Sequence, residues 1–250
     1  MNMDRVLALV KMQLKKIIRE PAYLFLMILF PAALTFVFGL AFGFIESGIP
    51  GETQFDVMAP GLFAYACIFI IMIVAQSFAD DREQGLLKRI NVTPTSPTEF
   101  MGSYIISNTL LSIIQVLIVT GCALIIGFRP IGGVGGFSFA FIYIMLLSIC
   151  SVGFGLITAT VSKSSGTATG LSFIFILPQM FFGTFVPLND ATRIIALFLP
   201  SYYATDALTI LFRGGSILNL TIWIELGILS LMAIGIIILG ILLFKKYGKI

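Results

Sequence analysis

Acidic and basic side chains gather in one short stretch of an otherwise apolar chain. Between Ala79 and Phe100 the charged residues are Asp80, Asp81, Arg82, Glu83, Lys88, Arg89 and Glu99. Membrane-length apolar runs flank this stretch, so its charges have to face water or a soluble partner. The chain contains no His, which removes the commonest acid–base catalyst. We therefore interpret residues 80–100 as a docking element rather than as an active site.

The other reactive residue types give no second centre for chemistry. Cys67, Cys122 and Cys150 all lie inside apolar runs and lack metal-ligand or paired spacing, which is typical of small packing residues. The sequence contains no Gly-x-x-x-x-Gly-Lys-Ser/Thr phosphate loop. We therefore expect no metal, no cofactor and no ATP hydrolysis by this chain alone.

The composition is that of an integral membrane protein. Hydrophobic residues make up 58% of the 250 residues and charged residues 11%, and the mean hydropathy is +1.07. The net charge of +3 is too small to suggest nucleic acid. Six apolar runs are long enough to cross a membrane as helices. They cover residues 23–44, 60–79, 103–128, 137–161, 167–186 and 220–244.

The sequence thus predicts one all-α membrane domain over residues 1–250, with six transmembrane helices. Residues 3–20 place apolar and basic side chains on opposite faces of a helix, which indicates an interfacial amphipathic helix that ends before Pro21. The alternative is a positively charged flank of the first span. Charges occur throughout this segment and no cleavage site follows, so we do not expect a cleavable signal peptide.

The distribution of basic residues predicts the orientation. Most Lys and Arg residues outside the apolar runs lie in the N-terminal segment, in residues 80–100, at position 163 and at the C-terminus. The connections that alternate with these, on the opposite side of the membrane, contain only Arg129, Arg193 and Arg213. We therefore expect both termini and the 80–100 loop in the cytoplasm. The acidic residues 45–59 then form an exposed outer loop.

Residues 187–219, between the fifth and sixth runs, contain two helical patterns too short to span. The first, 189–199, has Asn189 or Asp190 as its N-cap, and the second, 201–213, has Ser201. Both are apolar, so we expect a re-entrant helical hairpin in the outer leaflet.

Single residues within the runs give further expectations. Pro31 and Pro178 predict kinks or local unwinding, and Gly153 and Gly155 offer points of close helix approach. Glu225 is the one evident charge inside a run. It is a candidate functional group, although a side chain that reaches the outer interface is the favoured interpretation.

The docking loop has the local chemistry of a stiff elbow. Ser96, Pro97 and Glu99 form a capping-box pattern at the start of the third span, and Pro94 stops the short helix predicted at 84–91. Exposed Leu86, Leu87 and Ile90 would contact a partner. The alternative is that these three side chains lie on the bilayer surface.

Two segments of the chain resemble a known family. The first is carried by Glu83, Gly85, Leu87, Lys88, Arg89, Val92, Thr93, Pro94, Ser96, Pro97, Glu99 and Phe100, and the second by residues 182–188 and 199–208. Together with Arg19-Glu20-Pro21 and Pro60-Gly61, they resemble type-2 permeases of ATP-binding-cassette exporters, particularly the multidrug and antibiotic-resistance branch. Thr209 and Ile90-Asn91 depart from the pattern and weaken the choice of branch.

The resemblance implies a permease dimer, most simply a homodimer, in the plasma membrane, with ATP and Mg held by two copies of a separate ATPase subunit. It assigns ATPase docking to Glu83, Gln84, Leu86, Leu87, Lys88 and Ile90. It places an outer gate at Pro187, Tyr202 and Asp206, and a substrate path along Phe69, Phe173, Phe175 and Met180. Pro94, Ser96, Pro97 and Glu99 would stiffen the loop.

The resulting hypothesis is an ATP-driven exporter of an amphipathic drug-like or lipid-like compound. A permease for polysaccharides or lipid-linked glycans fits less well, because residues 4–20 lack the Arg-Tyr-rich pattern of that branch. An intramembrane lipid enzyme would need a base to accompany Ser, Thr or Asp206. An ATP-independent secondary carrier remains the other alternative.

Overall fold

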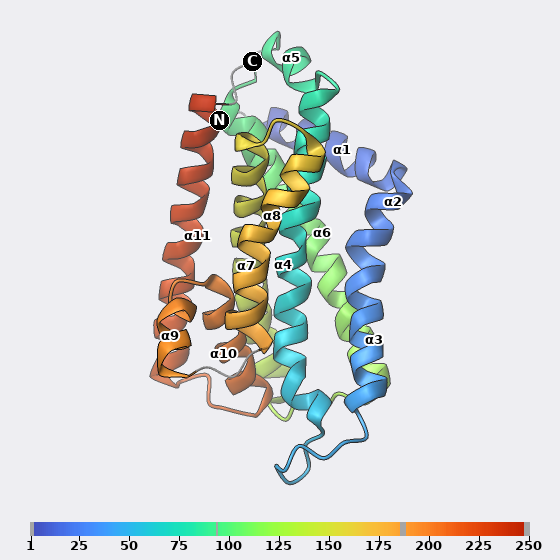
Figure 1. The fold of residues 1–250 in the computed structure, drawn as a ribbon, viewed down its shortest axis with the longest axis vertical. Helices are drawn as coiled ribbons and strands as arrows, with labels where there is room; N and C mark the ends of the chain where they lie inside the picture. The colour runs from blue at the N-terminus through green and yellow to red at the C-terminus, as the bar shows by residue number, and fades with distance from the viewer. Residues whose placement is uncertain (1–2, 94, 186–188, 248–250) are drawn as a thin grey trace.

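The computed structural model describes residues 3–93, 95–185 and 189–247 as a bundle of helices (Figure 1). In chain order the helices are α1 (Met3–Arg19), α2 (Pro21–Leu24), η1 (Phe25–Leu29), α3 (Phe30–Phe42), α4 (Gln54–Glu83), α5 (Leu86–Asn91), α6 (Pro97–Ile126), α7 (Gly133–Val161), α8 (Ser165–Met180), η2 (Phe181–Phe185), α9 (Asp190–Ala196), α10 (Pro200–Phe212) and α11 (Leu220–Tyr247). The two η segments are π-helical.

Five helical segments are long and apolar enough to cross a membrane. They are Gln54–Glu83, Thr98–Ile126, Gly133–Val161, Ser165–Phe185 and Leu220–Tyr247. This confirms the prediction of an all-helical integral membrane protein. The first apolar run differs from the single helix expected, because it is divided into α2, η1 and α3, and its apolar helix Met27–Phe42 is shorter than the others.

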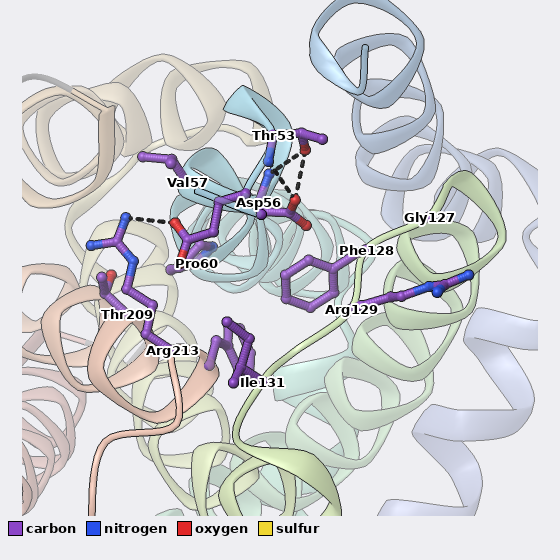
Figure 2. Close-up of a pocket in the computed structure, with 13 residues that line it drawn as sticks. Thr53, Asp56, Val57, Pro60, Gly127, Phe128, Arg129, Ile131, Thr209 and Arg213 are labelled. Atoms are coloured by element: carbon purple, nitrogen blue, oxygen red, sulfur yellow. Dashed lines mark hydrogen bonds and ion pairs between the residues drawn. The ribbon is translucent and has the colours of Figure 1, made fainter. Parts of the chain in front are cut away.

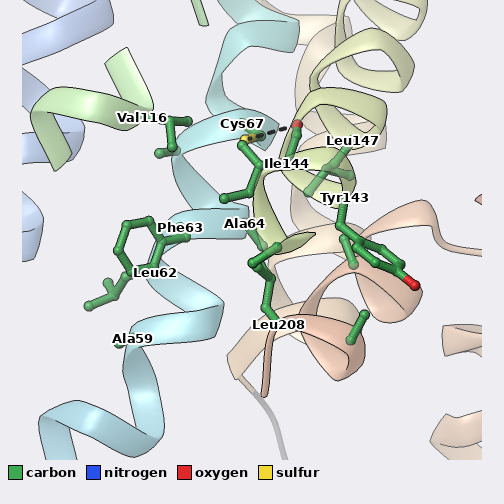
Figure 3. Close-up of a cluster of buried hydrophobic side chains, with 14 of the residues drawn as sticks. Ala59, Leu62, Phe63, Ala64, Cys67, Val116, Tyr143, Ile144, Leu147 and Leu208 are labelled. Atoms are coloured by element: carbon green, nitrogen blue, oxygen red, sulfur yellow. Dashed lines mark hydrogen bonds between the residues drawn. The ribbon is translucent and has the colours of Figure 1, made fainter. Parts of the chain in front are cut away.

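Helix α4 forms the centre of the bundle and packs against α7, α8, α6 and α10 (Figure 1). Its close contact with α7 depends on Gly155, where an added Cβ would come within 2.7 Å of the Ile71 carbonyl oxygen. The expected close approach at this glycine is confirmed. Figure 3 shows Cys67 of α4 donating to the carbonyl oxygen of Ile144 in α7, within the buried apolar cluster. All three cysteines are free thiols.

The two prolines predicted to disturb their helices lie next to π-helical turns. Pro31 follows η1 directly after Phe30, and Pro178 stands near the end of α8, just before η2. A proline removes one helical N–H donor and crowds the preceding turn, so the local hydrogen-bond register changes. At Pro31 the π-helical turn precedes the proline, so the expected local unwinding is confirmed there. At Pro178 the helix stays α-helical to Met180, and the π-helical turn follows the proline instead.

Helix α4 is longer than its apolar run at both ends, which corrects two predictions. The expected outer loop 45–59 is helical from Gln54, because the side chains of Thr53 and Asp56 form a capping box there. Phe55 and Ala59 are buried in the apolar cluster rather than exposed. At the other end, the charged run 80–83 belongs to α4 itself and is not part of a loop.

The two helical patterns in 187–219 are confirmed as α9 and α10, within the residues described there. Asn189 caps α9 with its side chain. Ser201 is not a cap, contrary to prediction: Leu199 is the N-cap, Pro200 occupies the first turn, and Ser201 Oγ donates to the Gln179 carbonyl oxygen at 3.1 Å. Helix α10 packs on α7, α11 and α4, so much of it lies inside the bundle.

Candidate functional site

We call the end of the bundle that carries α5 the α5 end, and the opposite end, which carries α9, the α9 end (Figure 1). The charged run predicted to dock a partner forms the last turn of α4 at the α5 end. We call its four residues, Asp80, Asp81, Arg82 and Glu83, the polar hub. Each of them contacts a different part of the chain.

The two aspartates of the hub hold the first helices. Asp81 is only 3% exposed, forms an ion pair with Lys16 of α1 and accepts a hydrogen bond from the hydroxyl of Tyr104 in α6. Asp80 accepts a hydrogen bond from the hydroxyl of Tyr23 in α2. A buried carboxylate is costly unless it is paired and hydrogen-bonded, and Asp81 has both kinds of partner. These contacts join α4 to α1, α2 and α6.

The other two hub residues hold the junction between α7 and α8. The Arg82 guanidinium donates to the carbonyl oxygens of Thr160, at 3.4 Å, and of Ser162 at the end of α7. The Glu83 carboxylate accepts from the backbone N–H of Ser165, at 2.7 Å, at the start of α8. A cation at a helix C-terminus and an anion at an N-terminus both complement the helix dipole. The last turn of α4 is thus bonded to five other helices.

Helix α1 is anchored to α6 by a buried amide. Gln13 is buried, and its Nε2 donates to Ser103 Oγ at 3.1 Å while its Oε1 accepts from Ser107 Oγ. The apolar side predicted for this helix is divided between two environments. Val6, Val10 and Ile17 are buried in the protein, whereas Leu7 and Ile18 are exposed. The structure therefore docks α1 firmly onto the bundle along one face.

The short helix predicted at 84–91 is α5, but it starts at Leu86. Gly85 has φ +74°, a left-handed conformation that glycine adopts easily, and so it separates α5 from α4. Ile90 is 8% exposed and packs in a buried cluster with Phe78 and Phe100. This corrects the prediction of an exposed Ile90: the sequence pattern could not show which face of so short a helix the rest of the fold covers.

The capping box at the start of α6 is confirmed. The backbone N–H of Glu99 donates to Ser96 Oγ at 3.2 Å, and the backbone N–H of Ser96 donates to the Glu99 carboxylate at 2.9 Å. Pro97 is the first residue of α6. Pro94 lies outside the described residues, as do the side chains of Leu87, Lys88 and Pro97.

A cavity of about 390 Å³ separates α1 from α5 and adjoins the hub. Its lining combines apolar side chains, amides and charges of both signs, from Met12, Gln13, Lys16, Glu20, Asp81, Gln84, Leu86 and Arg89. Of the residues predicted to dock a partner, Gln84 and Leu86 line this cavity, while Glu83 is bonded to α8. The lining could accept a polar protein segment with an apolar contact residue.

The four residues assigned to a substrate path do not share one surface. Phe69 stacks on Phe30 with the ring centroids 4.8 Å apart, and Met180 packs against the same apolar cluster as Phe69. Phe175 instead stacks on Phe154 at 4.7 Å, in a separate cluster. Phe173 is 41% exposed on α8. Phe69 and Met180 thus belong to one apolar cluster, whereas Phe173 and Phe175 lie outside it.

The residues assigned to an outer gate lie at the α9 end. Tyr202 and Asp206 are half-buried on α10, and Pro187 lies outside the described residues. Glu225 of α11 is next to Asp206 and is only 5% exposed, so its side chain does not extend to the surface as expected. Because α10 packs against α11, it covers this part of the helix. Glu225 Oε2 has no hydrogen-bond partner within the described part of the chain.

Sequence reasoning missed a cavity of about 170 Å³ at the α9 end (Figure 2). It lies between the start of α4, the α6–α7 connection and the end of α10, and Thr53, Asp56 and Phe128 contribute to its lining. Arg213, the C-cap of α10, is labelled in Figure 2; it forms an ion pair with Glu52, with the nitrogen and oxygen 3.2 Å apart. The capping pattern of Thr53 and Asp56, three residues apart in the sequence, predicts that α4 starts here.

The comparisons with known proteins identify the family. The family model described as "ABC-2 type transporter" matches residues 4–212, which is most of the chain. No curated protein matches the sequence. The matched domain is the transmembrane permease component of such transporters and not an ATPase domain. Helices α1 to α10, with the polar hub among them, fall inside the match. The chain belongs to the ABC-2 type transporter family.

Proposed function

We propose that this chain is the permease subunit of an ATP-driven exporter, powered by a separate ATPase subunit that docks at the α5 end. Family membership implies pairing with an ABC ATPase. The observation that carries the proposal is the polar hub, because the last turn of α4 is bonded to α1, α2, α6, α7 and α8. A displacement of α5 therefore reaches most of the bundle through α4.

The ATPase would bind where α5 meets α1. Gln84, Leu86 and Arg89 present amide, apolar and cationic groups to the cavity, and α1 supplies Lys16 and Glu20. Gly85 allows α5 to turn away from α4, and the capping box at Ser96 fixes the start of α6 beyond it. The short helix is thus held between two joints of defined geometry, which suits the transfer of force.

The α5 end then lies in the cytoplasm, as the excess of Lys and Arg at this end favours. The first of six spans is formed by α2, η1 and α3 together, because residues 21–42 are helical without a break and reach about 30 Å at ~1.5 Å per residue. On the outer side, α9 and α10 form the re-entrant pair. Ile194, Ile195 and Phe198, at and just beyond α9, are exposed apolar side chains suited to lipid contact.

The substrate is an amphipathic drug-like or lipid-like compound, moved by two copies of this chain in the plasma membrane. The support is compositional: 24 Phe and 10 Met give the helices a large, adaptable apolar surface. Part of it is exposed on α8, where Phe173, Ile174 and Leu177 have no cover within the described part of the chain.

Site-directed cross-linking tests the docking proposal. In a variant whose three native cysteines are replaced by Ala, a cysteine at Gln84 should cross-link to the co-expressed ATPase subunit. The matched control is a cysteine at Arg193, which is exposed at the α9 end. Cross-linking from position 193 but not from position 84 would place the ATPase at the wrong end and overturn the proposal.

A further inference from the structure

A second cavity at the α5 end lies on the side of the bundle away from α1. Its volume is about 720 Å³, and it lies between the α7–α8 junction and the end of α11. The lining residues are Arg82, Thr160, Val161, Ser162, Lys163, Leu243 and Tyr247. We call it the α11 cavity. The ends of α7 and α11 lie at the same end of the bundle (Figure 1).

The α11 cavity carries positive charge with no carboxylate to balance it. Neither Arg82 nor Lys163 has a salt-bridge partner among the described residues, and the nearby Glu83 carboxylate is bonded to the Ser165 amide. The carbonyl oxygens of Thr160 and Ser162 hold the Arg82 guanidinium in place. Lys163 is exposed at the mouth. An anion in the cavity would therefore contact the Arg82 guanidinium, which is held in place, and the Lys163 ammonium, which is on an exposed side chain.

The hydroxyl groups of the lining do not add donors for such an anion. Thr160 Oγ1 donates to the Leu156 carbonyl oxygen at 2.7 Å, and Ser162 Oγ donates to the Thr158 carbonyl oxygen at 2.6 Å. Their protons are therefore already used. Recognition therefore depends on the two cations, the Arg82 guanidinium and the Lys163 ammonium, of which the ammonium acts as a point charge.

The opposite wall of the α11 cavity is apolar and faces outward. Helix α11 lines it with Leu243, which is half-buried, and with Tyr247, which is 54% exposed. Lys246 lies 5.0 Å from the centroid of the Tyr247 ring. An exposed apolar helix that ends in Tyr and Lys is typical of the level where hydrocarbon meets lipid headgroups. A ligand here can place a charged group on the cations and alkyl chains along α11.

We propose that the α11 cavity binds the phosphate of an anionic phospholipid. Basic pockets between transmembrane helices at the membrane surface are suited to such headgroups. The cavity joins Arg82 of the hub to α11, so a bound lipid would brace the hub from the side opposite α1. The proposal needs only the membrane location of the chain, and the docking of an ATPase can fail without affecting it.

Native mass spectrometry of the detergent-solubilised chain tests this site. Phosphatidylglycerol should bind saturably to the wild type and phosphatidylcholine should not. Lys163→Gln should weaken phosphatidylglycerol binding about fivefold, as expected for one Lys near the headgroup. Lys163 forms no ion pair with any residue that the structure describes, so this variant is expected to fold. The matched control, Lys11→Gln, removes an exposed charge of α1 at the same end and should leave the affinity unchanged.

Four outcomes would overturn the proposal. Equal weakening by Lys163→Gln and Lys11→Gln would show diffuse attraction to surface charge instead of a site. Equal binding of phosphatidylcholine, whose choline cation cancels the charge of its phosphate, would show that the net charge of the headgroup is not recognised. Binding of soluble glycerophosphoglycerol as tight as that of the intact lipid would show a site for free phosphate esters. An acidic protein partner as the true occupant would leave the lipid affinity of Lys163→Gln at the wild-type level.

Discussion

The α5 end and the α9 end of the bundle are held together in different ways. At the α5 end, the polar bonds join residues far apart in the sequence, such as Lys16 with Asp81 and Arg82 with Ser162. At the α9 end, many polar bonds are local capping boxes, at Thr53 and at Asn189. Long-range bonds tie separate helices into one unit, whereas caps stabilise single helices. The α9 end also has long-range bonds, such as the partly exposed Arg213–Glu52 pair, but it has no buried ion pair among the described residues. We therefore expect the α5 end to move as a unit and the helices of the α9 end to be coupled less tightly.

The largest effect is expected from breaking the buried ion pair of the hub. Asp81→Asn leaves the Lys16 ammonium without its buried partner. We expect the free energy of unfolding, measured in mixed SDS micelles, to fall by about 3 kcal/mol, the lower end for buried pairs because Lys16 is partly exposed. Replacing Lys16, Asp81 and Tyr104 together by Met, Leu and Phe should restore most of this loss. A loss below about 1 kcal/mol for Asp81→Asn would show that the polar hub does not hold the α5 end together.

The next effect concerns the junction with α8. Glu83→Ala removes the acceptor for the Ser165 amide, which should cost about 1 kcal/mol of unfolding free energy. It should also abolish substrate-stimulated ATPase activity in the complex with the ATPase subunit, because α8 is no longer bonded to α4. Asp190→Ala, in the first turn of α9, is the control and should leave stimulation intact. If both variants kept normal stimulation of the ATPase, the hydrogen bond between Glu83 and Ser165 would have no role in coupling.

Two equivalent caps allow a direct comparison of the ends. Ser96→Ala and Thr53→Ala each remove one capping side chain and should cost about 1 kcal/mol of unfolding free energy. Only Ser96→Ala is expected to reduce substrate-stimulated ATPase activity, because that cap fixes the joint between α5 and α6. If Thr53→Ala reduced substrate-stimulated ATPase activity as much as Ser96→Ala, the two ends of the bundle would be equally important for coupling to the ATPase subunit.

The smallest effect is expected at the exposed ion pair of the α9 end. Arg213→Gln breaks the contact with Glu52 in a partly exposed position. Such pairs are screened by solvent, so the free energy of unfolding should change by less than about 1 kcal/mol, and less still at high salt. A larger, salt-insensitive loss would mean that the α9 end is held as firmly as the hub.

The sequence was most informative where a structure depends on neighbouring residues. The capping boxes at Ser96 and Asn189 involve residues three positions apart, so their patterns are visible in the chain. The π-helical turn before Pro31 follows from the missing N–H of proline in the same way.

The hub could not be predicted because its partners are distant in the sequence. Nothing in the residues 80–83 themselves shows that Asp81 meets Lys16 or that Arg82 reaches the end of α7. The burial of Ile90 and of Glu225 likewise depends on which helices cover them. The charge pattern alone therefore predicts a partner surface, whereas the structure uses these side chains for bonds within the chain.

Transport in proteoliposomes tests the central claim most directly. Vesicles would contain the chain with or without its ATPase subunit, and the uptake of a rhodamine dye would be followed with and without ATP. The account predicts directional dye movement only when the ATPase subunit and ATP are both present. Directional movement by the purified chain alone would contradict it.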